Sequence, residues 1–235
     1  KAIVDRLMAR LRVARLPETG AAYPVEVALR QDRLRITLDM SGEALNRRGY
    51  RTWNGEAPLR ETLAAALVTL SPWRPGIPLY DPCCGTGTLL IEAAMTAVNR
   101  APGVNRAFAC ERYAFMPGEE MQALRDKARA AETPDAPFSI AGSDIDPEAL
   151  TLCGRHIEQA GFAGRIPVSR ADLRTLTLSE EHGVFLCNPP YGERLGDRES
   201  CRALYRELGL LLGRHPTWKM GVISADPGFE RAFGH

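Results

Sequence analysis

From about Ile77 to Ile223, short apolar runs of strand length alternate with longer segments whose apolar residues recur at helical spacing. This alternation is typical of βαβ units, in which parallel strands form a sheet and the intervening helices cover both of its faces. Strands are expected near residues 77–80, 138–142, 166–169, 184–187 and 220–223. Helices are expected over residues 88–98, 119–131, 147–160 and 201–212. We therefore predict an α/β protein with a Rossmann-like, mostly parallel sheet.

The first 52 residues follow a different pattern. Apolar residues at helical spacing run from Ile3 to Ala14 and stop at Pro17. Residues 25–29 and 34–40 alternate apolar and polar side chains around a turn, which predicts a β-hairpin. A further helix is expected to begin at Pro58. The predicted domains are an N-terminal helix and β-hairpin connector over residues 1–52 and the α/β domain over residues 53–235.

Composition restricts the class of protein. The 235 residues are 45% hydrophobic and 25% charged, which is ordinary for a globular chain, and the net charge of +1 excludes a uniformly basic nucleic-acid binder. Residues 1–60 carry twelve Lys or Arg against seven acids, so this end is predicted to meet phosphate. The six cysteines lack CxxC spacing, and no apolar run reaches the roughly 18 residues of a membrane helix. We expect a cytoplasmic protein with no metal and no membrane segment.

The segment DPCCGTGTLLIE, residues 81–92, joins a predicted strand to a predicted helix through a glycine-rich turn. Ligands bind at the carboxyl ends of parallel strands, where glycine permits close approach. A dinucleotide fingerprint would need glycine in place of Leu90, and no phosphate-binding GxxxxGK[ST] string is present. Asp81 would repel a diphosphate and attract a cation, which favours S-adenosylmethionine. We expect a side chain at Gly87 to fill space that the methionine portion of the cofactor needs.

Acidic residues follow the next two predicted strands. Asp144 ends the second strand, where a carboxylate can accept hydrogen bonds from both hydroxyls of a ribose. Asp146 has a simpler role as the N-cap of the next helix, which opens with a proline. Asp172 follows the third strand, where an acid could accept from an adenine amino group.

The segment CNPPYGERLGD, residues 187–197, follows the predicted strand at 184–187. Two successive prolines remove two amide donors, so the Asn188 side chain and the carbonyl of Pro189 would present acceptors. The lone pair of an exocyclic amine is delocalised into its base, and acceptors that hold the amine protons bring it toward an electrophilic methyl group. Tyr191 offers a ring on which a flipped-out base can stack. The string predicts methyl transfer to a base amine.

These two strings, in this order and at these strand ends, resemble those of class I S-adenosylmethionine-dependent amino-methyltransferases, whose catalytic motif is Asn/Asp-Pro-Pro-Tyr/Phe. Further blocks are similar to RNA methylases that carry an N-terminal THUMP domain, and most similar to RlmL-type guanine-N2 methyltransferases of 23S ribosomal RNA. These blocks are LDMSGEALNRRGYR, APLRETLAAAL, GSDIDP, NPPYGERLGD and LYRELG. The resemblance implies a Rossmann-like class I methyltransferase whose last strands follow residue 235. It also implies a THUMP domain, with room for a second methyltransferase domain, in the full-length protein.

The resemblance implies site residues as well. The expected cofactor-binding residues lie at the strand ends: Asp81, Pro82, Cys84, Gly85, Thr86, Gly87, Asp144, Ile145, Asp146, Asp172, Leu173 and Asn188. The expected catalytic residues are Asn188, Pro189, Pro190 and Tyr191. The helix that follows Ala57 is implied to cover the methionine end of the cofactor, where Glu61 would either contact it or lie exposed.

The expected function is methylation of a flipped-out guanine in 23S ribosomal RNA. Adenine N6 in RNA or DNA is the nearest alternative, because the Asn-Pro-Pro-Tyr string alone does not separate the two amines. A second alternative is a protein that keeps the cofactor fold without catalysis, which the intact string disfavours. A third, a nicotinamide oxidoreductase, is disfavoured by the missing third glycine.

Overall fold

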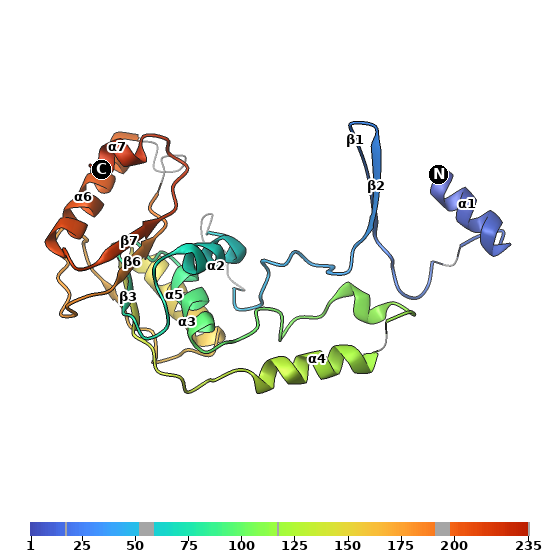
Figure 1. Ribbon diagram of the computed structural model, residues 1–235, viewed down its shortest axis with the longest axis horizontal. Coiled ribbons are helices and arrows are strands. Elements are labelled where there is room, and N and C mark those ends of the chain that lie inside the picture. The colour runs from blue at the N-terminus through green and yellow to red at the C-terminus, as the bar shows by residue number, and fades with distance from the viewer. Residues whose placement is uncertain (17, 52–58, 117, 191–197, 235) are drawn as a thin grey trace. The chain divides into compact units, whose positions relative to one another are not determined.

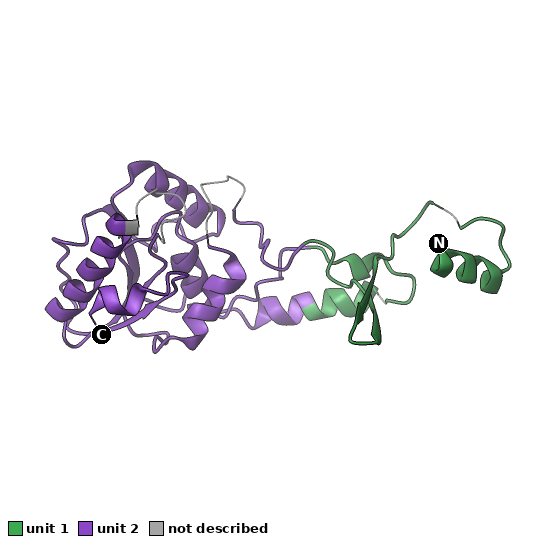
Figure 2. Ribbon diagram, turned by 90° about the horizontal axis from the view of Figure 1, so that it is seen from above, with its two compact units in different colours: residues 1–43, 107–124 green, residues 44–106, 125–235 purple. Residues whose placement is uncertain are grey.

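The computed structural model describes residues 1–16, 18–51, 59–116, 118–190 and 198–234. The chain divides into two compact units, which Figure 2 distinguishes by colour. The smaller unit comprises residues 1–43 and 107–124, and the larger unit comprises residues 44–106 and 125–235. Residues 44–51 thus belong to the compact unit of the α/β fold, whereas the sequence pattern suggested a domain boundary after residue 52.

A parallel sheet of five strands forms the centre of the larger unit (Figure 1). The strands are β3 (Leu79–Asp81), β4 (Ile140–Asp144), β5 (Val168–Arg170), β6 (Val184–Cys187) and β7 (Lys219–Val222). Their order is β5-β4-β3-β6-β7, and every neighbouring pair is parallel. The strand order reverses between β3 and β6, and open α/β sheets bind ligands at such a switch point. The predicted Rossmann-like α/β fold is confirmed.

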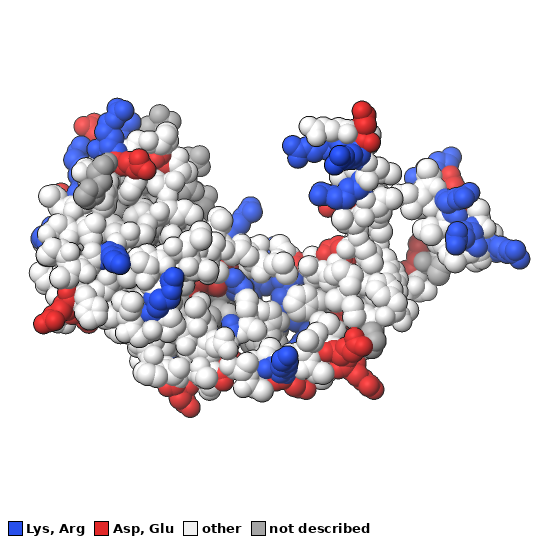
Figure 3. All heavy atoms as spheres, in the orientation of Figure 1, with Lys and Arg blue, Asp and Glu red and all other residues white. Residues whose placement is uncertain are grey.

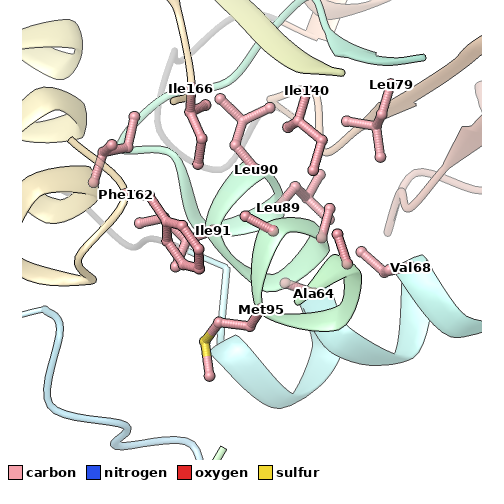
Figure 4. Close-up of a cluster of buried hydrophobic side chains, with 14 of the residues drawn as sticks. Ala64, Val68, Leu79, Leu89, Leu90, Ile91, Met95, Ile140, Phe162 and Ile166 are labelled. Carbon is pink, nitrogen blue, oxygen red and sulfur yellow. The ribbon is translucent and has the colours of Figure 1, made fainter. Parts of the chain in front are cut away.

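Helices cover both faces of this sheet because alternate strand residues point to opposite faces. Leu79 packs with α2 (Glu61–Leu70), α3 (Thr88–Ala97) and α5 (Pro147–Gln159), whereas the next residue, Tyr80, packs with Phe185 and Trp218 on the face covered by α6 (Arg198–Arg214). Figure 4 shows the first of these cores, in which side chains from α2 and α3 meet those of β3 and β4. Helix α3 is buried along almost its whole length.

The ends of the helices mostly follow the sequence signals. Asp146 caps α5 as predicted, since its Oδ1 accepts a hydrogen bond from the backbone N–H of Glu148 at 2.8 Å, and Pro147 takes the first position. Helix α2 begins at Glu61 and not at the expected Pro58, which lies outside the described residues. A carboxylate in the first turn of a helix is stabilised by the helix dipole, which accounts for the later start.

The smaller unit contains α1 (Ala2–Leu11) and the predicted hairpin of β1 (Val25–Arg30) and β2 (Arg33–Leu38). The hairpin turn places Gln31 and Asp32 at φ of 50° and 58°, the backbone region that tight hairpin turns require. Segment 101–118, expected to be irregular, contains the 3-10 helix η1 (Ala109–Arg112). Its Cys110 N–H donates to the carbonyl of Met40 at 3.2 Å, which joins this segment to the residues after the hairpin.

The remaining elements are short or exposed. Helix α4 (Gly118–Ala130) contains no buried residue, and α7 (Phe229–Phe233) packs against α6. Within the described ranges, no helix has both the length and the apolar character needed to cross a bilayer.

Candidate active site

The predicted site residues follow the carboxyl ends of β3, β4, β5 and β6. Because these strands are parallel, the segments that follow them lie at one edge of the sheet. Cys83 after β3, Leu173 after β5 and Cys187 at the end of β6 belong to one apolar cluster. The glycine turn and the Pro-Pro corner are therefore neighbours across the switch point between β3 and β6.

Backbone hydrogen bonds hold the glycine turn against β4. The N–H of Cys84 donates to the carbonyl of Ser143 at 2.9 Å, and the N–H of Gly85 donates to Oδ2 of Asp144 at 2.8 Å. Gly85 has a φ of +51°, and a Cβ placed on it would meet no atom within 4 Å. The backbone at Gly85 therefore borders open space, as a turn that a cofactor approaches closely requires.

Gly87 is required for a different reason from the one expected. A Cβ on Gly87 would lie 2.5 Å from Sγ of Cys153 on α5, and the residue has a φ of +84°. The space that a side chain would take is occupied by the protein itself and not by the methionine portion of a cofactor. A substitution at Gly87 would consequently disturb the packing of α5 against the turn.

Asp81 lies beneath the turn, with only 2% of its surface exposed. Its Oδ1 accepts from the N–H of Cys83 at 3.0 Å, and burial raises the pKa of this carboxyl well above its usual range. Pro82 and Cys84 are also buried, and contact with the Cys153 thiol, together with burial, raises the pKa of Cys84. Asp81 therefore supports the turn from below, and its contact with a cofactor stays a prediction.

The carboxylate of Asp144 is half-buried and faces the turn. Its Oδ1 accepts from the N–H of Asp146 at 3.0 Å, while its Oδ2 accepts from Gly85. Each carboxylate oxygen has a further lone pair for a ligand hydroxyl. Next to it, Ile145 exposes 59% of its surface and offers an apolar contact at the same edge.

Asp172 is engaged by a nearby guanidinium. Both of its carboxylate oxygens accept from Nε of Arg174, at 2.9 and 2.8 Å, and Oδ2 also contacts Nη2. These bonds lower the pKa of Asp172 to about 2. Leu173 is buried and packs near Cys187. A contact between Asp172 and an adenine amino group stays a prediction.

The Pro-Pro corner leaves the Asn188 side chain available. Asn188 is half-buried and directly follows β6, and Pro189 is buried. The carbonyl of Pro190 accepts from the hydroxyl of Tyr205, a fully buried residue of α6, at 2.9 Å. No hydrogen bond within the described part of the chain engages the Asn188 side chain. The remaining predicted catalytic residue, Tyr191, lies outside that part.

A buried ionic cluster beside the turn was missed by the sequence reasoning. Glu92 on α3 is 3% exposed, its Oε1 lies 2.9 Å from Nε of Arg48, and the hydroxyl of Tyr50 donates to the same oxygen at 2.8 Å. Burial outweighs these partners and raises the pKa of Glu92 to about 7. A single acid in an otherwise apolar helix was the available signal, because a buried carboxylate requires partners.

The second half of this cluster surrounds Arg51. Its Nη2 donates to the carbonyl of Leu59 at 2.9 Å and to Oγ1 of Thr88 at 3.1 Å, and it lies 3.4 Å from Oε1 of Glu61. Glu61 is buried, so the expectation of an exposed carboxylate is wrong. Arg51 and Arg48 were counted among the basic residues predicted to meet phosphate, but both are instead used in buried ion pairs.

On α5, His156 supports the turn from another side, with Nδ1 3.1 Å from the carbonyl of Thr86. Across the residues that the structure describes, no three His, Cys, Asp or Glu side chains come together as metal ligands would. The arrangement is thus a glycine turn, a carboxylate and an amide around one edge of the sheet.

Comparisons with known proteins agree with this arrangement. Residues 48–235 match the family model described as the RMKL-like methyltransferase domain. The chain is 39% identical over 236 residues to the Bacillus subtilis protein named "Putative RNA methyltransferase YpsC", with all of this chain and 61% of that protein covered. It is 36% identical over 248 residues to "Ribosomal RNA large subunit methyltransferase K/L" of Magnetococcus marinus, with 99% of this chain and 34% of that protein covered.

Solved structures are similar over the whole chain. SMU.472, described as a methyltransferase complexed with SAH, has a TM-score of 0.92 at 35% identity, with 100% of this chain and 62% of that chain covered. A structure from Listeria monocytogenes, titled as an N6-adenine-specific DNA methylase predicted for that organism, has a TM-score of 0.91 at 41% identity, with 99% and 62% covered. This chain thus spans about three fifths of three of these four proteins and a third of the other.

The fold and the residues at its switch point define a Rossmann-like methyltransferase domain, and S-adenosylmethionine is the methyl donor of such domains. Within that class, the chain belongs to the RMKL-like methyltransferase domain family. The open space at Gly85 and the carboxylate of Asp144 fit a cofactor that carries a ribose and no phosphate.

Proposed function

We propose that this chain methylates the exocyclic amine of a flipped-out base in RNA, and that the base is guanine, modified at N2, in 23S ribosomal RNA. RNA as substrate is supported by the names of the Bacillus and Magnetococcus relatives. Guanine is supported by the blocks of sequence that resemble the RlmL-type enzymes. The observation that carries the proposal is the available Asn188 amide at the switch point, beside the glycine turn.

The bound cofactor supplies an electrophilic methyl group. Gly85 and Asp144 would hold it at the edge of the sheet. The side-chain oxygen of Asn188 and the carbonyl of Pro189 would accept the protons of the base amine and so direct its lone pair. Tyr205 fixes the corner by holding the carbonyl of Pro190. Such positioning can supply roughly 7 to 11 kcal/mol of the barrier, and no strong general base is needed.

The longer protein would carry an RNA-binding THUMP domain, in keeping with the greater length of the relatives. The hairpin supports this part of the proposal because one of its faces is apolar and exposed: Leu29 and Leu34, paired across the strands, are 73% and 62% exposed. An isolated hairpin is marginally stable, so a further domain would cover that face. The Magnetococcus relative, of which this chain covers 34%, has room for a second methyltransferase domain. Action on ribosomal RNA would take place in the cytoplasm.

One observation favours a second candidate. The Listeria structure is named for adenine N6 in DNA, and the chain is 41% identical to it. Adenine carries an exocyclic amine of the same type, which the same acceptors could hold.

Nucleoside analysis separates these candidates. The protein is incubated with labelled S-adenosylmethionine and ribosomal RNA from cells that lack the corresponding gene, and the RNA is then hydrolysed to nucleosides. Labelled N2-methylguanosine is the expected product. Labelled N6-methyladenosine, or transfer to DNA alone, would support the second candidate. Binding of S-adenosylhomocysteine with no transfer to either nucleic acid would indicate a protein that keeps the fold without catalysis.

A further inference from the structure

The N-terminus of α3 begins directly after the cofactor turn, yet no side chain caps it. Its N-cap is Gly87, which has no side-chain oxygen, and the N-cap of α2, Arg60, makes no capping bond either. The backbone N–H groups at a helix start are ordinarily satisfied by such caps. Some other group must therefore define where these two helices begin relative to each other.

Arg51 lies between these two helix starts. Its Nη2 contacts the carbonyl of Leu59, just before α2, and Oγ1 of Thr88, the first residue of α3. The guanidinium is 11% exposed, and the buried carboxylate of Glu61 lies 3.4 Å away. A cation beside two helix N-termini is unfavourable, and Glu61 offsets that cost. Glu61 is itself fixed by Nδ2 of Asn46, at 3.3 Å.

The opposite side of the turn is held independently. Ser143, Asp144 and His156 bind the backbone of Cys84, Gly85 and Thr86 from β4 and α5. None of these bonds reaches Thr88. The turn is thus fixed to the sheet on one side and, through Thr88, to Arg51 on the other.

The structure assigns Arg51 a new role as a positioning residue for cofactor binding, acting through the hydroxyl of Thr88. Arg51 fixes the first turn of α3 and thereby the backbone of Gly85 to Gly87, which the cofactor must meet. The segment from Asn46 to Arg51, where the chain enters the larger unit, is therefore part of the apparatus that shapes the cofactor site.

The cluster provides a matched control for this role. Thr88→Val and Tyr50→Phe each delete one buried hydroxyl that bonds within the same cluster. Thr88 borders the turn, whereas the Tyr50 hydroxyl bonds Glu92, one helical turn further along α3. Both changes are expected to lower the melting temperature. Only Thr88→Val is expected to weaken binding of S-adenosylhomocysteine, by about tenfold, which corresponds to about 1.4 kcal/mol.

The experiment measures S-adenosylhomocysteine affinity by calorimetry and hydrogen exchange of the amides of residues 85–88 in the cofactor-free protein. Thr88→Val should accelerate that exchange, and Thr88→Ser, which keeps the hydroxyl, should restore both exchange and affinity. Arg51→Met should behave as Thr88→Val does; if it fails to fold, Thr88→Val still decides. Unchanged affinity in Thr88→Val, or equal losses in Thr88→Val and Tyr50→Phe, would overturn the assignment. None of these readouts depends on the nature of the methylated base.

Discussion

The N–H of Gly85 donates to Oδ2 of Asp144 at 2.8 Å, so that the turn after β3 is fastened to the carboxylate that ends β4. The two residues are 59 positions apart in the sequence. One carboxylate therefore shapes the glycine turn and also stands where a ribose would be bound. Loss of this carboxylate should affect both properties together.

Asp144→Ala is expected to weaken S-adenosylhomocysteine binding by at least about tenfold, because the Gly85 amide loses its acceptor and the ribose loses a partner. Calorimetric titration measures this change. Asp146→Ala is the comparison, since it removes the α5 cap and should cost about 1 kcal/mol of stability with a smaller loss of affinity. Equal affinity losses in the two variants would contradict the role given to Asp144.

Gly85→Ala and Gly87→Ala should fail in different ways. At Gly85 a methyl group enters open space, so the protein should fold with a modest loss of stability but bind S-adenosylhomocysteine poorly. At Gly87 the methyl group would meet the Cys153 thiol, so the free energy of unfolding should fall by about 1 to 3 kcal/mol. Denaturant unfolding together with ligand titration separates the two effects. A stable Gly87→Ala protein would show that the turn has been misplaced.

The pH dependence of stability should report on Glu92. Its pKa is raised from 4.5 to about 7 on folding, so the folded state binds a proton more tightly than the unfolded state. The stabilisation is complete below about pH 4.5 and is lost as the pH rises through 7, a difference of order 3 kcal/mol. Urea unfolding from pH 5 to 8 should show a smaller decline for Glu92→Gln than for the wild type. Parallel curves would contradict the raised pKa.

The arginines of the hairpin should contribute to RNA affinity. Arg30 and Arg33 are paired directly across the strands, with Arg35 on the same face, and like charges so placed destabilise a hairpin unless an anion lies between them. Figure 3 shows basic side chains on this hairpin and on α1. Arg33→Glu with Arg35→Glu should weaken RNA binding and reduce its salt dependence by about 0.7 to 0.9 per lost phosphate contact. Arg129→Glu, on exposed α4, is the charge-matched control, and an equal effect from it would remove the hairpin from the RNA surface.

Much of the fold could be predicted because its signals are local. The 3.6-residue period of α5 and its Asp146 cap lie within one segment, and the five strands were found from short apolar runs between turn residues. The position of Asn188 at a strand end followed from the same alternation. The register of the strands, by contrast, required the structure.

The ionic cluster could not be predicted because its partners are distant in sequence. Tyr50 and Glu92 are 42 residues apart, and Arg51 and Thr88 are 37 apart. Arginines in a polar segment are usually solvated, so Arg48 and Arg51 gave no sign of burial. The contact between Cys153 and Gly87 likewise depends on how α5 packs against the turn, which periodicity does not determine.

The most direct test of the account is the effect of Asn188→Ala on methyl transfer and on cofactor binding, measured on the same preparation. Removal of the acceptor should lower single-turnover transfer to RNA by about 10²- to 10³-fold while S-adenosylhomocysteine affinity stays nearly unchanged. Asn188→Asp, which keeps an acceptor oxygen, should recover part of the rate. Full activity in Asn188→Ala, or a loss of rate that only parallels a loss of cofactor affinity, would contradict the proposal that this side chain holds the reacting amine.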